Sequence, residues 1–118
     1  MAGDTPSLEA IRQQAIILIE ADRWKMTETS ERTGRRFLRD QDLVPFPTQL
    51  SIVNHLQQLL KEPNCSLIPV PMGIPEGSGG MAYRVRDPRS LDLYVKVKIE
   101  EDILWILSFK RSDHGRRR

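Results

Sequence analysis

Cysteine is almost absent from this sequence of 118 residues, which contains only Cys65. One cysteine cannot form an internal disulfide or a four-ligand zinc site, so a reducing compartment is the simplest interpretation. Histidine is nearly as scarce, and His55 and His114 are too far apart in sequence to form a metal-ligand motif. We interpret Cys65 as a small buried apolar residue rather than a nucleophile, and the histidines as surface or packed side chains rather than ligands or bases.

Long apolar runs are also missing. The longest run near the N-terminus, residues 15–19, is far too short to span a bilayer, and no signal peptide is recognisable. The sequence has no nucleophile elbow, dinucleotide-binding fingerprint or Walker motif, and the glycine-rich stretch 73–80 lacks the lysine of a phosphate-binding loop. These absences predict a soluble cytoplasmic protein with no membrane partner, no cofactor and no metal.

The composition is that of a folded globule, with 39% hydrophobic and 29% charged residues. The length suits one domain over residues 1–118, in which the polar segment 112–118 forms a flexible tail. The net charge of +2 permits nucleic-acid binding without requiring it, because the distribution of charge matters more than the sum.

Three helices are predicted in the first half of the chain. Thr5-Pro6-Ser7 provides a start for a helix over about 7–21, a charged helix follows over about 30–40, and a third runs from Thr48 to about Lys61. The charged helix has little apolar content beyond Phe37 and Leu38. The side chains of the other two that we expect to face inward are Leu8, Ile11, Ala15, Ile16, Ile17, Leu18, Ile19, Leu50, Ile52, Val53, Leu56, Leu59 and Leu60.

Strand patterns dominate the rest of the chain. Residues 24–27 predict a short strand, and residues 66–72 an edge strand, because Pro69 and Pro71 cannot donate to a neighbour. Strands are also predicted over 81–86, over 91–100 with strict apolar–polar alternation, and over the apolar run 103–109; turns are expected at 87–90 and 100–102. Helices followed by an antiparallel meander predict an α+β fold.

The last three predicted strands carry side chains that could act on a phosphate. Because neighbouring strands lie about 4.8 Å apart, side chains on one face of them can converge. Cations neutralise a phosphate, and a tyrosine next to cations can transfer a proton. However, alternating lysines are also typical of an ordinary solvated strand, and the pattern alone favours that interpretation. The residues concerned are Arg84, Arg86, Arg89, Tyr94, Lys96, Lys98, Lys110 and Arg111.

A resemblance to a known family lies mainly in the last two predicted strands, about a quarter of the chain. The residues that carry it are Leu93-Tyr94-Val95-Lys96-Val97-Lys98-Ile99, Asp102-Ile103-Leu104 and Leu107-Ser108-Phe109-Lys110. This segment resembles the C-terminal hairpin of the motility quorum-sensing regulator toxins, with one extra residue in the turn. Ala82-Tyr83-Arg84 followed by Arg86 is similar to the preceding strand of that family, and residues 42–56 to its central helix.

The resemblance implies a RelE-like antiparallel sheet backed by two to three helices. It also implies an endoribonuclease toxin that needs neither metal nor ribosome, cleaves single-stranded mRNA through the ribose 2′-hydroxyl, and is neutralised by a cognate antitoxin. Tyr94 and Lys110 match the family's catalytic tyrosine and C-terminal lysine, and Lys61 a third functional lysine. Arg84, Arg86, Lys96 and Lys98 would bind RNA. The family's glutamine before the Tyr-Arg strand is replaced by glycine, near Gly80.

A non-catalytic protein is the alternative. It would be a degenerate toxin, or an interaction module that pairs through the edge strand around 66–72. The missing glutamine and the proline-bearing edge favour this hypothesis, whereas the expected convergence of Tyr94 and Lys110 favours the nuclease.

Overall fold

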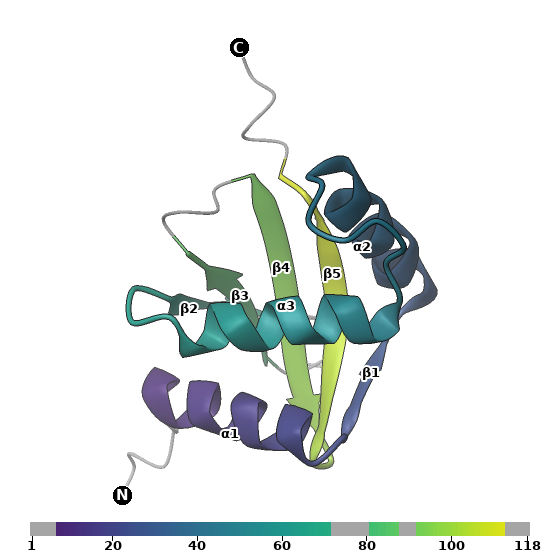
Figure 1. Ribbon diagram of the computed structural model, residues 1–118. Helices are drawn as coiled ribbons and strands as arrows, with labels where there is room; N and C mark the ends of the chain where they lie inside the picture. The colour runs from purple at the N-terminus through teal and green to yellow at the C-terminus, as the bar shows by residue number, and fades with distance from the viewer. Residues whose placement is uncertain (1–6, 72–80, 88–91, 113–118) are drawn as a thin grey trace, which may run out of the picture.

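The computed structural model describes residues 7–71, 81–87 and 92–112 and confirms the α+β fold (Figure 1). The predicted glycine loop 73–80 and most of the turn 87–90 lie outside the described residues, as do Arg89 and His114. None of the described helices is both long enough and apolar enough to cross a membrane. The elements are α1 Leu8–Glu20, β1 Trp24–Met26, α2 Glu28–Asp40, α3 Gln49–Lys61, β2 Ser66–Pro71, β3 Met81–Arg86, β4 Leu93–Glu100 and β5 Ile103–Arg111.

A hydroxyl side chain caps the start of each helix. Ser7 accepts a hydrogen bond from the backbone N–H of Ala10, and Thr48 forms a reciprocal capping box with Ser51 at the start of α3. In α2 the cap is Thr27, whose hydroxyl accepts from the N–H of Ser30. The second helix therefore begins at residue 28, two residues before the predicted start.

The five strands form one sheet in the order β1-β5-β4-β3-β2. The predicted hairpin of β4 and β5 is confirmed, and its turn residues Glu101 and Asp102 both have positive φ, at 54° and 60°. Two such residues twist the chain in the sense that suits a two-residue hairpin. β2 lies at the edge, as its prolines predicted. β1 pairs with β5 in parallel, which the sequence pattern did not reveal.

The core lies between the sheet and the helices, with α3 crossing in front of β4 and β5 in Figure 1. Leu56 and Leu60 of α3 and Phe109 of β5 are fully buried there. Three predicted inward residues were wrong: Leu8, Ile17 and Leu50 are 41%, 59% and 58% exposed. Leu8 and Leu50 are in the first turns of their helices, where few neighbours surround a side chain, and the 100° step per residue directs Ile17 away from the buried stripe.

Helix α2 runs along the part of β5 that extends beyond β1. The hydroxyls of Ser30 and Thr33 donate to the backbone carbonyls of Ile106 and Phe109, at 2.9 and 2.7 Å. Gly34 permits the close packing of α2 on both β5 and α3, because a Cβ there would lie 3.1 Å from Cδ1 of Phe109 in β5 and 2.8 Å from Cδ1 of Ile52 in α3. The exposed face of α2 is consequently fixed beside the C-terminal end of β5.

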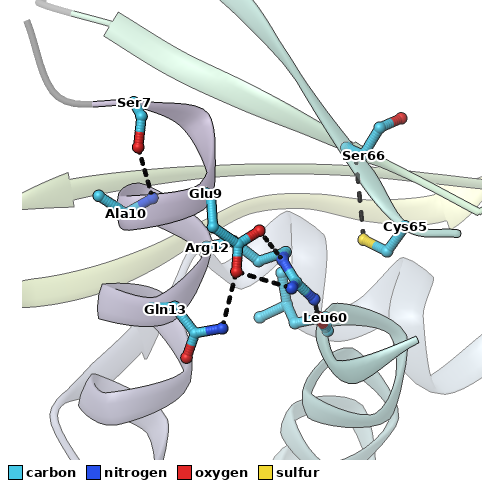
Figure 2. Close-up of polar contacts among 8 residues, drawn as sticks. All are labelled: Ser7, Glu9, Ala10, Arg12, Gln13, Leu60, Cys65 and Ser66. Carbon is cyan, nitrogen blue, oxygen red and sulfur yellow. Dashed lines mark hydrogen bonds and ion pairs between the residues drawn. The ribbon is translucent and has the colours of Figure 1, made fainter. Parts of the chain in front are cut away.

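An arginine joins α1 to α3. Arg12 forms an ion pair with Glu9 at 2.8 Å and donates to the backbone carbonyl of Leu60, near the end of α3 (Figure 2). Its hydrogen bonds hold the pKa of Glu9 below the ordinary value. Cys65, nearby, is half-buried, and burial raises the pKa of its thiol, so its side chain packs rather than reacts.

The last described residue belongs to the folded part of the chain. Ser112 is 2% exposed and its N–H donates to the carbonyl of Asp92, so the prediction of a tail beginning at residue 112 was wrong at that position. This backbone hydrogen bond continues the pairing of β4 with β5 by one residue. The polar composition of residues 112–118 does not reveal such a bond.

Candidate functional site

One face of the sheet carries no described helix, and we call it the open face. Along β4, Val95 and Val97 are buried in the core, so Tyr94, Lys96 and Lys98 point to the opposite side. All three side chains are half-buried. The alternation predicted from the sequence therefore separates the core from a surface rich in cations.

Tyr94 lies at the centre of a cluster on this face. Lys110 of β5 is its cross-strand partner, with Nζ 5.7 Å from the centre of the phenol ring. Arg84 of β3 approaches from the other side, with Cζ 5.1 Å from the same centre. The sheet thus brings together two cations and a phenol that are spread over residues 84 to 110, as the sequence predicted.

The guanidinium of Arg84 has unused hydrogen-bonding capacity. Its Nε is buried, and among the described residues it has no hydrogen-bond partner. Buried polar atoms are normally satisfied, so a buried donor without a partner next to the half-buried Tyr94 is unusual. A guanidinium also presents a fork of donors that matches phosphate oxygens, so Arg84 could bind an anion next to Tyr94 through its terminal amino groups.

The remaining predicted RNA-binding residues surround this cluster. Lys96 lies between Arg84 and Ser108 in the strand register, and Arg86 is exposed at the end of β3. Lys98 forms an ion pair with Glu100 at 3.5 Å. Within residues 7–71, 81–87 and 92–112, Arg86, Lys96 and Lys110 have no ion pair, so their charges remain available to an anion.

Lys61 is not part of the cluster. It ends α3, which packs on the core face of the sheet, whereas Tyr94 is on the open face. Its Nζ instead lies 3.4 Å from the carboxylate of Glu20 in α1. The structure does not bring Lys61 together with Tyr94 and Lys110. Gly80, near which the resembled toxins have a glutamine, lies outside the described residues.

Sequence reasoning missed a set of arginines on α2. Arg32, Arg35, Arg36 and Arg39 are all exposed, and their 3-1-3 spacing places them on one side of the helix. Arg35 pairs with Glu31 at 3.0 Å. Arg36 also lines a surface recess shared with the end of β5, whose lining residues are Thr33, Arg36, Phe37, Asp40, Gln41, Lys110 and Arg111. The helical spacing of these arginines in the sequence could have predicted a positively charged side of α2, of which Arg36 lies next to the end of β5.

The arrangement can bind an anion and stabilise charge that develops on it. Arg84 and Lys110 supply positive charge, and the Tyr94 hydroxyl can carry a proton. Among the described residues, no three histidine, cysteine, aspartate or glutamate side chains are grouped so that they could hold a metal ion.

No protein-family model matches the chain, and neither a curated protein nor a solved structure shows significant similarity to it.

Proposed function

We propose that the protein is an endoribonuclease that cleaves single-stranded RNA through the ribose 2′-hydroxyl. The observation that carries this proposal is the position of Tyr94 on the open face, with Arg84 of β3 and Lys110 of β5, the two strands next to β4, both close to its ring. A phenol held between two cations combines a proton carrier with charges that can stabilise a phosphorane-like transition state. The resemblance of the last two strands to the motility quorum-sensing regulator toxins supports the same function.

The reaction would follow from the chemistry of these groups. The 2′-oxygen attacks the adjacent phosphorus, and the bond from phosphorus to the 5′-oxygen of the next nucleotide breaks. The products are a 2′,3′-cyclic phosphate and a 5′-hydroxyl. The nucleophile loses one proton and the leaving oxygen gains one; Tyr94 carries one of these transfers and solvent the other. Arg84 and Lys110 stabilise the negative charge on the phosphate oxygens. No step requires a metal.

RNA is the proposed target because the nucleophile is the 2′-hydroxyl, which DNA lacks. Arg86, Lys96 and Lys98 lie beside the cluster and would bind neighbouring phosphates. By the same resemblance, we propose that the substrate is cytoplasmic mRNA, that the ribosome is not required, and that a cognate antitoxin neutralises the protein.

A non-catalytic interaction module is the second candidate. β2 is an edge strand, and an extended segment of a partner could pair with its free side. Pro69 and Pro71 remove two of its backbone donors, which limits the length of such pairing. Expression of the chain would separate the two functions: growth arrest that a neighbouring reading frame relieves supports the toxin, whereas unaffected growth supports the module.

The direct test is a single-turnover assay on one labelled single-stranded RNA in EDTA. Wild type should cleave it, and a 2′-deoxy substitution at the scissile nucleotide should abolish cleavage because the nucleophile is gone. Tyr94→Phe keeps the ring but removes the hydroxyl, and should slow cleavage by about 10²–10⁴-fold, the range for a lost acid or base. Equal rates for Tyr94→Phe and wild type would contradict the role of Tyr94, and no cleavage by wild type would contradict the proposed function.

A further inference from the structure

The two tryptophans of the chain occupy opposite faces of the sheet. Trp24 of β1 packs against the core, and its indole N–H donates to the carboxylate of Asp22 at 3.1 Å. Trp105 of β5 lies between Leu104 and Ile106, which are both fully buried. Strand alternation therefore directs Trp105 to the open face, where its indole is half-buried and takes no part in the core.

Cations flank Trp105 on both sides. Nζ of Lys25, its partner on β1, lies 5.8 Å from the centre of the indole ring, and Lys98 is its cross-strand partner on β4. A large aromatic ring set among lysines suits a ligand that has both a flat apolar surface and negative charge.

Trp105 and the Tyr94 cluster share one surface. Tyr94 and Lys98 are four residues apart on β4, about 13 Å at 3.3 Å per residue. Between them, Lys96 lies opposite Ser108 on the same face.

A second copy of the chain is a poor candidate for binding this surface. Two copies that face each other would bring Arg84, Lys96 and Lys110 of each copy close to the same cations of the other. The charge favours a polyanion instead.

We propose that Trp105 is a stacking platform for an unpaired base of the RNA strand whose phosphate is held over Tyr94. The inference rests on the proposed function and extends it to substrate recognition. Base–aromatic stacking tolerates any base, and it requires a strand whose bases are not paired. It therefore predicts a preference for single strands over duplexes without any contact that reads sequence.

The test uses tryptophan fluorescence in a Trp24→Phe background, in which Trp105 is the only indole. The probes are a short 2′-O-methyl oligouridine, which cannot be cleaved through its 2′-oxygen, and a strand of equal length in which abasic sites replace the bases. The oligouridine should quench the fluorescence and bind more tightly than the abasic strand. In the protein that retains Trp24, Trp105→Leu should weaken oligouridine binding by about 5- to 150-fold, the range for one stacked base. Trp105→Phe should restore most of the affinity, because it keeps an aromatic ring.

The outcomes separate this inference from the function on which it rests. Binding without quenching, equal affinity for both probes, or full affinity in Trp105→Leu would overturn the platform while leaving cleavage through Tyr94 intact. If wild type binds no oligonucleotide and cleaves no RNA, the proposed function fails instead. Trp24→Phe serves as the matched control. Trp24 packs against the core and lines a recess beside Trp105, and phenylalanine keeps an aromatic ring there, so the affinity should be unchanged.

Discussion

The guanidinium of Arg84 lies over the ring of Tyr94, with Cζ 5.1 Å from the ring centre, although the two residues are on different strands. The contact leaves Nε of Arg84 buried without a hydrogen-bond partner among the described residues. A guanidinium also has terminal amino groups, which would donate to a phosphate placed next to the phenol. In the proposed site, Arg84 would therefore both bind the phosphate and stabilise the negative charge that develops on it.

Replacement of Arg84 should reveal whether its shape matters as well as its charge. Arg84→Ala should lower kcat/KM by about 10²–10³-fold, as for one lost electrostatic donor. Arg84→Lys keeps the charge but loses the planar fork, so it should recover only part of that loss. Full activity in the lysine variant, measured by single-turnover cleavage, would show that charge alone is needed.

Tyr94 and Lys110 should act as a unit, because Lys110 approaches the ring as a cross-strand partner. Lys110→Ala alone should cost about 10²–10³-fold in cleavage rate. The variant that combines Tyr94→Phe with Lys110→Ala should lose much less than the product of the two single losses. A double-mutant cycle measures this, and strictly multiplicative losses would indicate that the two groups act independently.

RNA affinity should fall steeply with salt if the open face binds phosphates. For single strands the slope of log K against log salt changes by about 0.7 for each cation that contacts a phosphate. Lys96→Gln should flatten the slope by about that amount, and Lys98→Gln by less, because Glu100 already accompanies Lys98. Lys61→Gln is the matched control on the core side of the sheet and should leave the slope unchanged. A slope insensitive to Lys96 would place the RNA elsewhere.

Two leucines of α3 should respond very differently to truncation. Leu56 is fully buried, so Leu56→Ala should reduce the free energy of unfolding by about 2–5 kcal/mol. Leu50 is 58% exposed, so Leu50→Ala should change it by less than about 0.5 kcal/mol. Denaturant unfolding followed by circular dichroism gives both values. Equal losses would contradict the observed rotation of α3.

His55 should make stability depend on pH in mildly acidic solution. Its ring packs edge-on against Phe109, with centroids 5.9 Å apart, and burial lowers its pKa from 6.5. The unfolded chain then binds the proton more readily than the folded one, so stability is complete above about pH 6.5 and is lost as pH falls through that value towards the lower pKa of the folded state. Glu9 and Glu31, whose pKa values are lowered from 4.5, act only in more acidic solution.

The measurement is the free energy of unfolding between pH 7 and pH 5 for wild type and His55→Gln. The wild-type curve should fall more steeply, with an excess slope of no more than about 1.4 kcal/mol per pH unit, the limit for one proton. Any contribution of His114 cancels in the difference between the two proteins. Parallel curves would mean that burial does not perturb His55.

Local sequence patterns were enough to predict the helices, the strands and the α+β class, because each of these depends on residues that are near neighbours in the chain. Alternation over residues 93–100 fixed which side chains of β4 enter the core, and so predicted that Tyr94, Lys96 and Lys98 share the other face. Hydroxyl caps and prolines marked most of the boundaries to within two residues. These features need no knowledge of distant parts of the chain.

Contacts between residues that are far apart in the chain could not be predicted in this way. The parallel pairing of β1 with β5, the alignment of Arg84 with Lys96, and the position of Lys61 next to Glu20 depend on register and packing between elements far apart in sequence. A lysine at a helix end looks the same in sequence whichever face of the sheet the helix covers. Packing of α3 against the core removed Lys61 from the candidate site, and the two-residue alternation of β5 added Trp105 to the open face.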